Sequence, residues 1–159
     1  MQHLIAKASV LIEALPYIQD FAKSVVLVKF GGSAMEDPEI TRSVLQDIAF
    51  MASAGMRPIV VHGGGKAITA EMKKRQIESH FINGLRYTCE KSISVVDEVM
   101  HRDINPSLVK QLAACGANPA PMSGKDILRA RKITTRNQET GEPIDLGFVR
   151  EVINVDTPQ

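Results

Sequence analysis

Two short apolar segments of this sequence each lead into glycines and then into a helix-like segment, and this repeated pattern constrains the fold more than any other feature. Val25–Phe30 leads into Gly31–Gly32, and Ile59–Val61 leads into His62–Lys66, which holds three consecutive glycines. A continuous apolar strand followed by a glycine turn and a helix is typical of parallel sheets with right-handed crossovers. The sequence therefore predicts an α/β fold with a mainly parallel sheet.

The other elements are expected from apolar periodicity and from turn and capping residues. Asp37-Pro38-Glu39 is typical of a helix start, because aspartate caps free N–H groups and proline suits the first turn. Asn83-Gly84 between short apolar stretches indicates a β-hairpin. Helices are expected over Leu4–Phe21 with a kink at Pro16, from Pro38 to about Ala54, over Lys66–Arg75, and over Glu90–Cys115 with a break at Asn105-Pro106. Strands are expected over Arg57–His62 and Pro119–Met122, and over Leu128–Ile133 and Phe148–Val155, which form a protruding hairpin.

The glycine turns form a candidate anion-binding site. Glycines between a strand and a helix let backbone N–H groups approach an anion, and the helix N-terminus adds positive charge. Lys29, beside Gly31 and Gly32, could bridge phosphate oxygens as negative charge moves between them. Alternatively, Lys29 is a strand-end lysine that simply reaches solvent. Arg86 could bind a carboxylate through its two-pronged guanidinium, or it could be an ordinary surface arginine.

Other motifs leave alternatives open or exclude them. His62-Gly63-Gly64-Gly65 resembles an esterase oxyanion hole, but the Gly-x-Ser-x-Gly nucleophile motif that such enzymes require is absent. The common nucleotide-binding glycine motifs are absent as well. His62 is expected to be structural, because no carboxylate that would orient it is evident. Ser123-Gly124-Lys125-Asp126 could line a cleft or could be only a loop.

Composition excludes several classes of protein. The chain of 159 residues is long enough for one ordinary domain, and its net charge of +1 argues against a nucleic-acid surface. No apolar run is long enough to span a bilayer, and the N-terminus does not read as a secretory signal. Cys89 and Cys115 form no metal-binding pattern, and unpaired thiols in a reducing cytoplasm are expected.

Taken in order, these motifs resemble the N-acetylglutamate kinases of the amino-acid kinase superfamily over nearly the whole chain. The matching segments are Leu11–Ile18, Val28–Met35, Val60–Gly65, Gly84–Thr88, Ser123–Asp126 and Asp145–Val149. The resemblance implies the N-terminal domain of the amino-acid kinase fold, a three-layer α/β/α sandwich. In this family the N-terminal half binds the acylated amino acid and carries the dimer contact, and the C-terminal half binds ATP.

The resemblance also implies roles for individual residues. Lys29 is implied as catalytic, and together with Gly31 and Gly32 it contacts the transferred phosphoryl group. Gly64, Gly65 and Arg86 hold N-acetyl-L-glutamate, with Arg86 on a carboxylate. The reaction is phosphoryl transfer from ATP, with Mg²⁺, to the side-chain carboxylate of N-acetyl-L-glutamate in arginine biosynthesis. Since an ionised carboxylate attacks without a general base, catalysis depends on positioning and charge neutralisation.

We therefore expect residues 1–23 to be an N-terminal helical extension and residues 24–159 to be the acyl-amino-acid-binding domain of a cytoplasmic kinase, without its ATP-binding domain. The chain alone is expected to turn over slowly or not at all. One alternative is a non-catalytic module for acyl-amino-acid binding or oligomerisation, and another is a related carboxylate or carbamate kinase. A homodimer at least is expected, because the Glu90–Cys115 helical region and the N-terminal helix offer more apolar surface than one small sheet needs. The resemblance implies that the N-terminal helix could link dimers into a hexamer.

Overall fold

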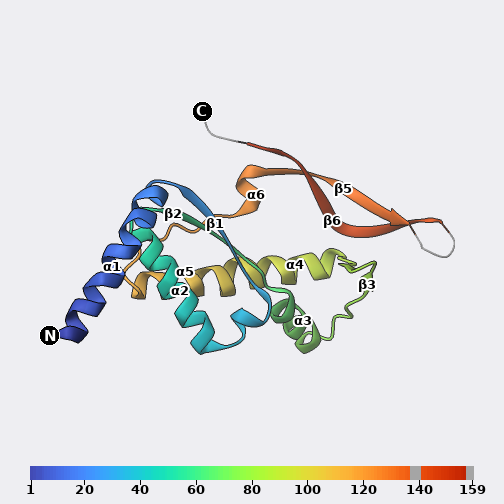
Figure 1. Ribbon diagram of the computed structural model, residues 1–159. Helices are drawn as coiled ribbons and strands as arrows, with labels where there is room; N and C mark the ends of the chain where they lie inside the picture. Colours follow the sequence, from blue (N-terminus) through green and yellow to red (C-terminus); the bar gives the residue numbers. More distant parts are fainter. Residues whose placement is uncertain (137–140, 157–159) are drawn as a thin grey trace. The chain divides into compact units, whose positions relative to one another are not determined.

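The computed structural model describes residues 1–136 and 141–156 (Figure 1). The chain divides into two units, each held by its own contacts. The first unit comprises Met1–Gly63 and Val109–Pro119, and the second comprises Gly64–Leu108 and Ala120–Gln159. Among the described residues, no helix combines the length and the apolar character needed to cross a membrane.

A parallel pair of strands lies at the centre of the first unit. Its elements are α1 (Gln2–Phe21), β1 (Val25–Phe30), the 3₁₀ helix η1 (Gly32–Met35), α2 (Pro38–Ser53) and β2 (Arg57–His62). β1 and β2 pair in parallel, from Val25 opposite Arg57 to Phe30 opposite His62. The prediction of an α/β fold with a parallel sheet is thus confirmed.

Helix α2 begins where the capping motif predicts. The Asp37 carboxylate accepts hydrogen bonds from the N–H groups of Glu39 and Ile40, at 2.8 and 3.1 Å. Leu45 and Ile48 are buried on the side of α2 that lies against the sheet. This local motif therefore fixes the start of the helix.

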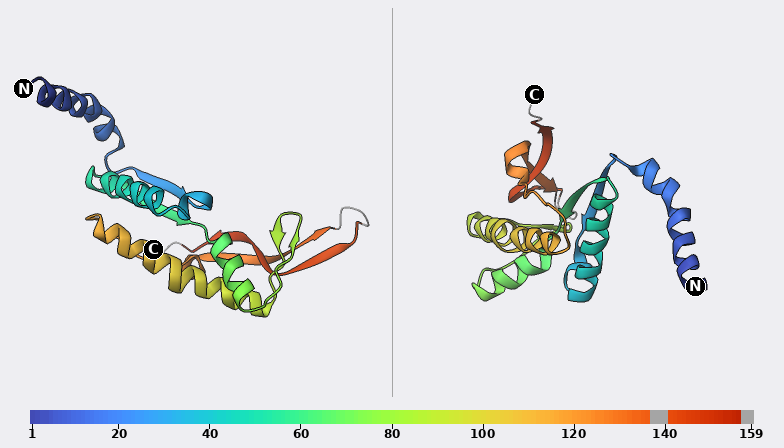
Figure 2. Two further views of the ribbon diagram at one scale, coloured as in Figure 1. Left: turned by 90° about the horizontal axis from the view of Figure 1, so that it is seen from below. Right: turned by 90° about the vertical axis from the view of Figure 1, so that its left-hand side faces the viewer.

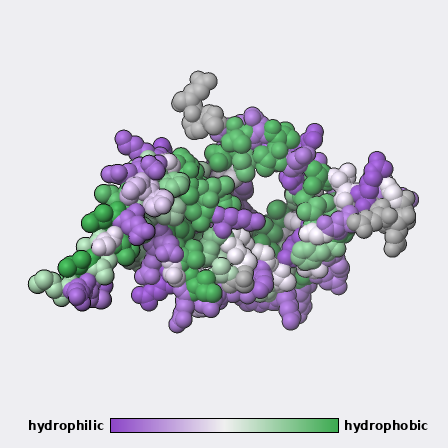
Figure 3. Space-filling model, viewed as in Figure 1, coloured by the Kyte–Doolittle hydropathy of each residue, from purple (hydrophilic) through white to green (hydrophobic). Residues whose placement is uncertain are grey.

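The other face of the β1–β2 pair is bare. Leu27 is 68% exposed and Ile59, its partner in the register, is 46% exposed. Val25 and Val61 are exposed on the same side of their strands. Figure 3 shows apolar residues gathered at the surface over this part of the chain. We call these four side chains the bare sheet face.

The second unit is built on helices and two antiparallel strand pairs. Its elements are α3 (Gly65–Lys74), β3 (Phe81–Ile82), β4 (Leu85–Arg86), α4 (Glu90–Glu98), the π-helical segment η2 (Val99–Ile104), α6 (Gly124–Ile127), β5 (Leu128–Arg136) and β6 (Pro143–Val155). Helix α5 (Asn105–Ala114) contains the division between the units. One hydrophobic core cluster of the second unit consists of Ile68, Met72, Val95 and Val99.

The helical region that begins at Glu90 changes its winding before Pro106. α4 and η2 form one continuous ribbon (Figure 2), with π-helical winding over Val99–Ile104. Pro106 has no N–H to donate to the carbonyl four residues earlier, which favours a wider turn at this point. The expected break at Asn105-Pro106 is therefore a change of helix type.

The long hairpin β5–β6 is joined to the rest of the second unit near Thr88. The Thr88 N–H donates to the Leu146 carbonyl at 3.1 Å, and the Phe148 N–H donates to the Thr88 carbonyl at 2.7 Å. Between them Gly147 adopts a φ of +73°. The predicted hairpin is confirmed, with strands that are longer than expected. The part of its predicted turn at residues 137–140 lies outside the described residues.

One predicted strand is wrong. The structure places no strand over Pro119–Met122, and Ser123 instead caps the short helix α6, its hydroxyl accepting from the Lys125 N–H at 3.3 Å. Pro119 and Pro121 have no N–H groups, so this segment has little with which to form a sheet ladder.

Candidate anion-binding site

The first glycine turn, Gly31–Gly32, lies at the carboxyl end of β1. It lies directly beside Gly63, the first glycine of the second glycine turn. The Gly63 N–H donates to the Phe30 carbonyl at 2.9 Å, and a Cβ built on Gly31 would lie 3.5 Å from the Gly63 nitrogen. Gly32 has a φ of +64°, which glycine adopts without strain. Lys29 is the next-to-last residue of the same strand, and its side chain is exposed. The first unit thus brings Lys29, Gly31 and Gly32 to one strand end, as the sequence predicts.

The rest of the second glycine turn belongs to the second unit, where Gly64 is the N-cap of α3. A Cβ on Gly64 would lie 2.5 Å from the Met100 sulfur and 2.9 Å from Cδ1 of Ile104. A Cβ on Gly65, by contrast, would meet nothing within 4 Å in the part of the chain that the structure describes. Gly64 therefore allows η2 to pack closely, whereas Gly65 leaves open space at the start of the helix.

Arg86 lies beside this helix start. Its guanidinium donates to the Thr69 hydroxyl at 2.7 Å and to the Gly65 carbonyl at 3.4 Å, and it also donates to the Ser79 hydroxyl. The guanidinium carbon lies 4.5 Å from the centre of the Phe81 ring. Arg86 is half-buried, and its burial lowers the pKa of the guanidinium. It is therefore held in place and is not an ordinary surface arginine.

The charge of Arg86 is not neutralised by these contacts. Its partners within the described residues are hydroxyls, a carbonyl, a thioether and a ring, all of them uncharged. The N-terminus of α3, to which Gly65 and Thr69 belong, adds partial positive charge of its own. A fixed cation beside a glycine-capped helix start is an environment suited to a carboxylate or a phosphate.

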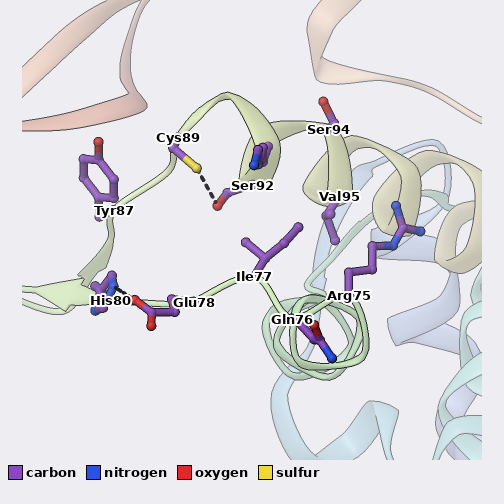
Figure 4. A pocket seen from close by; sticks show the side chains of 11 residues that line it. Arg75, Gln76, Ile77, Glu78, His80, Tyr87, Cys89, Ser92, Ser94 and Val95 are labelled. Atoms are coloured by element: carbon purple, nitrogen blue, oxygen red, sulfur yellow. Dashed lines mark hydrogen bonds and ion pairs between the residues drawn. The ribbon is translucent and has the colours of Figure 1, made fainter.

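A separate pocket of about 670 Å³ lies in the second unit between the end of α3 and the start of α4 (Figure 4). Its lining residues are Arg75, Gln76, Ile77, Glu78, His80, Tyr87, Cys89, Lys91, Ser92, Ser94 and Val95. Arg75 is paired with Glu71 at 2.7 Å and with Glu98 at 2.9 Å. Since Arg86 does not line this pocket, the pocket is distinct from the candidate anion-binding site.

Cys89 stands at the N-cap of α4 and lines this pocket. The Cys89 sulfur lies 3.3 Å from the Ser92 hydroxyl, and this hydrogen bond lowers the pKa of the thiol. Both cysteines are free, as the sequence predicts.

The structure brings together one polar cluster that the sequence motifs do not indicate. It consists of Asp97, His101, Ser123 and Lys125. Asp97 and His101 are four residues apart in one helical segment, a spacing that could have suggested their contact. Ser123 lies 22 residues further along the chain from His101, and no local pattern predicts that approach.

The fold and the glycine turns define a class of protein, and comparison with known sequences identifies it. Residues 24–158 match the amino acid kinase family, and the chain belongs to this family. The predicted resemblance to acetylglutamate kinases is confirmed over one half of those proteins. The acetylglutamate kinase of Symbiobacterium thermophilum is 42% identical over 158 residues, which cover 98% of this chain and 54% of that protein. The acetylglutamate kinase of Akkermansia muciniphila is 39% identical, covering 94% of this chain and 50% of that protein.

Solved structures share the fold. N-acetylglutamate synthase from Neisseria gonorrhoeae, complexed with coenzyme A and N-acetyl-glutamate, superposes with a TM-score of 0.68 at 18% identity, covering 94% of this chain and 33% of that one. A protein from Streptococcus mutans superposes with a TM-score of 0.67 at 24% identity, covering 83% of this chain and 51% of that one. The chain spans about half the length of the curated relatives that it matches.

Proposed function

We propose that this chain is the acyl-amino-acid-binding half of an acetylglutamate kinase. The complete enzyme would transfer a phosphoryl group from ATP, with Mg²⁺, to the side-chain carboxylate of N-acetyl-L-glutamate, in arginine biosynthesis in the cytoplasm. The observation that carries the proposal is Arg86, a half-buried cation with uncharged partners beside the glycine-capped start of α3. Relatives that are named acetylglutamate kinase support the choice of substrate.

Each predicted site residue has a role in this proposal. Arg86 binds a carboxylate of the acyl amino acid, and Gly65 gives the ligand access to the N–H groups at the start of α3. Gly64 has a structural role in the same glycine turn, because it allows Met100 to pack closely against the backbone. Residues 24–159 form the acyl-amino-acid-binding domain, and residues 1–23 form an extension that contains α1.

Contact with the phosphoryl group is assigned to three residues of the first unit, Lys29, Gly31 and Gly32. Lys29 is the proposed catalytic residue, because its ammonium would neutralise charge on the transferred group. The acceptor carboxylate is ionised at neutral pH and attacks phosphorus directly, so no protein base is required. Catalysis then depends on in-line positioning and on electrostatic stabilisation.

Because the chain spans about half of its relatives, a second candidate is a module that binds the acyl amino acid without catalysing its phosphorylation. A third is a kinase for another carboxylate or for a carbamate. Calorimetric titration of the chain separates these candidates. N-acetylglutamate binding without ATP–Mg²⁺ binding favours the module, and tighter binding of acetylaminoadipate, aspartate or carbamate favours the third candidate.

The proposed role of Arg86 predicts the effect of its substitution. Arg86→Gln should weaken N-acetylglutamate binding by about ten- to a hundredfold, because a charge-assisted pair is lost. Calorimetry measures the affinity, and thermal unfolding verifies that the variant is folded. Arg131→Gln is the matched control, because Arg131 is paired with Glu151 on the hairpin. Equal affinity of wild type and Arg86→Gln would exclude this role.

We also propose that α1 associates with a second copy of the chain. α1 buries none of its residues, and Leu4 and Leu11, which share one helix face, are each 68% exposed. Wild-type protein should sediment as a dimer or a larger assembly at micromolar concentration, and Leu11→Lys should shift it toward monomer. Glu13→Gln, a polar change on the opposite face of the same helix, should leave the assembly intact. Monomeric wild-type protein would contradict the proposal.

A further inference from the structure

A serine, a histidine and an aspartate lie in a chain of hydrogen bonds in the second unit, and none of the three is a predicted anion-binding residue. The Ser123 Oγ lies 2.9 Å from Nε2 of His101, and Nδ1 of His101 lies 2.8 Å from Oδ1 of Asp97. These contacts have the order and the lengths found in catalytic triads of serine hydrolases. The three residues come from the α4–η2 helical segment and from the N-cap of α6.

The bonding pattern determines where the protons lie. The Asp97 carboxylate is ionised, because its hydrogen bond from Lys125 and the nearby His101 lower its pKa. An ionised carboxylate only accepts hydrogen bonds, so Nδ1 of His101 must donate to it. In the neutral ring, Nε2 is then an acceptor, and the Ser123 hydroxyl donates to it. His101 is therefore oriented to take the proton of the Ser123 hydroxyl.

We propose that Ser123 is an activated nucleophile that accepts the acyl group of activated carboxylic esters. Ser123 Oγ forms a bond to the carbonyl carbon, its proton passes to Nε2 of His101, and the bond from that carbon to the leaving oxygen breaks. His101 then passes its proton to solvent, and water attacks the acyl carbon while His101 takes one of the water protons. That proton passes to Ser123 Oγ as the bond from Oγ to the acyl carbon breaks, and the product leaves as a carboxylate whose remaining proton goes to solvent. Asp97 is a positioning residue, since it holds the tautomer of His101 and stabilises its protonated form.

The surroundings of the cluster determine which esters can reach Ser123 and which leaving groups can depart. Ser123 is half-buried, and the side chains of His101 and Asp97 are 34% and 47% exposed, so a small ester can reach the hydroxyl. Lys125 donates to the same Asp97 oxygen at 2.5 Å and offsets part of the stabilisation of a protonated His101. The cluster supplies a nucleophile and a base, which suits esters whose leaving group departs without protonation, such as nitrophenyl esters.

Two probes test this proposal on the full chain. A fluorophosphonate should label Ser123, with an Oγ–phosphorus bond replacing the phosphorus–fluorine bond, and the labelled peptide is identified by mass spectrometry. p-Nitrophenyl acetate should release nitrophenolate. His101→Gln should slow both reactions about ten- to a hundredfold, and Ser123→Ala should abolish labelling at that position. Asp97→Asn should also slow them, because the amide can hold the other tautomer of His101.

Ser94→Ala is the matched control, since among the residues that the structure describes the Ser94 hydroxyl is bonded only to the Glu90 carbonyl, at 3.2 Å. This variant should react like wild type. Circular dichroism and N-acetylglutamate titration verify that every variant is folded. A purely structural cluster would leave Ser123 no more reactive than Ser94, so equal labelling of the two serines overturns the proposal. Unchanged labelling of Ser123 in a folded His101→Gln variant overturns it as well.

Discussion

Replacing Gly147 by alanine should lower the free energy of unfolding of the second unit by roughly 3 kcal/mol or more. Two causes act together. The φ of +73° at Gly147 is costly for any residue with a Cβ. In addition, a Cβ at this position would overlap the Thr88 carbonyl, which is backbone and cannot rotate away. A urea titration followed by circular dichroism measures the loss.

Gly141 provides a matched control for this substitution. Its φ is also +73°, but a Cβ built there would meet no described residue within 4 Å. Gly141→Ala should therefore show only the backbone cost, about 1–2 kcal/mol. The difference between the two variants isolates the overlap with the Thr88 carbonyl. Equal losses would mean that the hairpin can move away from Thr88 at little cost.

Replacing Met72 by alanine should cost about 2–5 kcal/mol of stability, which is the range for truncating a fully buried large side chain. Met72 has no exposed surface and lies in the core with Ile68, Val95 and Val99. Its sulfur also lies 3.5 Å from Nη1 of Arg86. The truncation should therefore weaken N-acetylglutamate binding too, because it removes part of the support beneath that guanidinium.

Met72→Leu is the control for this truncation. It conserves side-chain volume and should cost less than about 1.5 kcal/mol. Urea titration gives the stability of both variants, and calorimetry gives their affinity for the ligand. If Met72→Ala were as stable as Met72→Leu, the cluster around Met72 would not contribute to the stability of the second unit.

Elements that depend on neighbouring residues could be predicted from the sequence. Asp37 and Pro38 determine the start of α2 through contacts within four residues. Asn83 and Gly84 both adopt positive φ, +51° and +77°, which is the turn that an Asn-Gly hairpin requires. The first glycine turn and Arg86 could likewise be selected from local pattern and residue type.

Features that depend on residues far apart in the chain could not be predicted from the sequence. Pro119–Met122 is apolar enough for a strand, but a strand forms only beside another, and the sequence does not show which segment would pair with it. The approach of Ser123 to His101 joins residues that are far apart in the chain. The close contact of Gly64 with Met100 also arises only in the folded unit, so the sequence suggested a ligand as the sole reason for glycine there.

The bare sheet face restricts what could lie on it. Leu27 and Ile59 form an apolar strip with no charged side chain between them, and Lys29 follows on the same side, opposite Val61. A layer that covered the strip would have to be apolar, and it would have to end before the ammonium of Lys29, which is costly to bury without a counter-charge. The edge of such a layer would lie at the first glycine turn. It would cover the apolar side of the two strands and still leave the turn open to an anion.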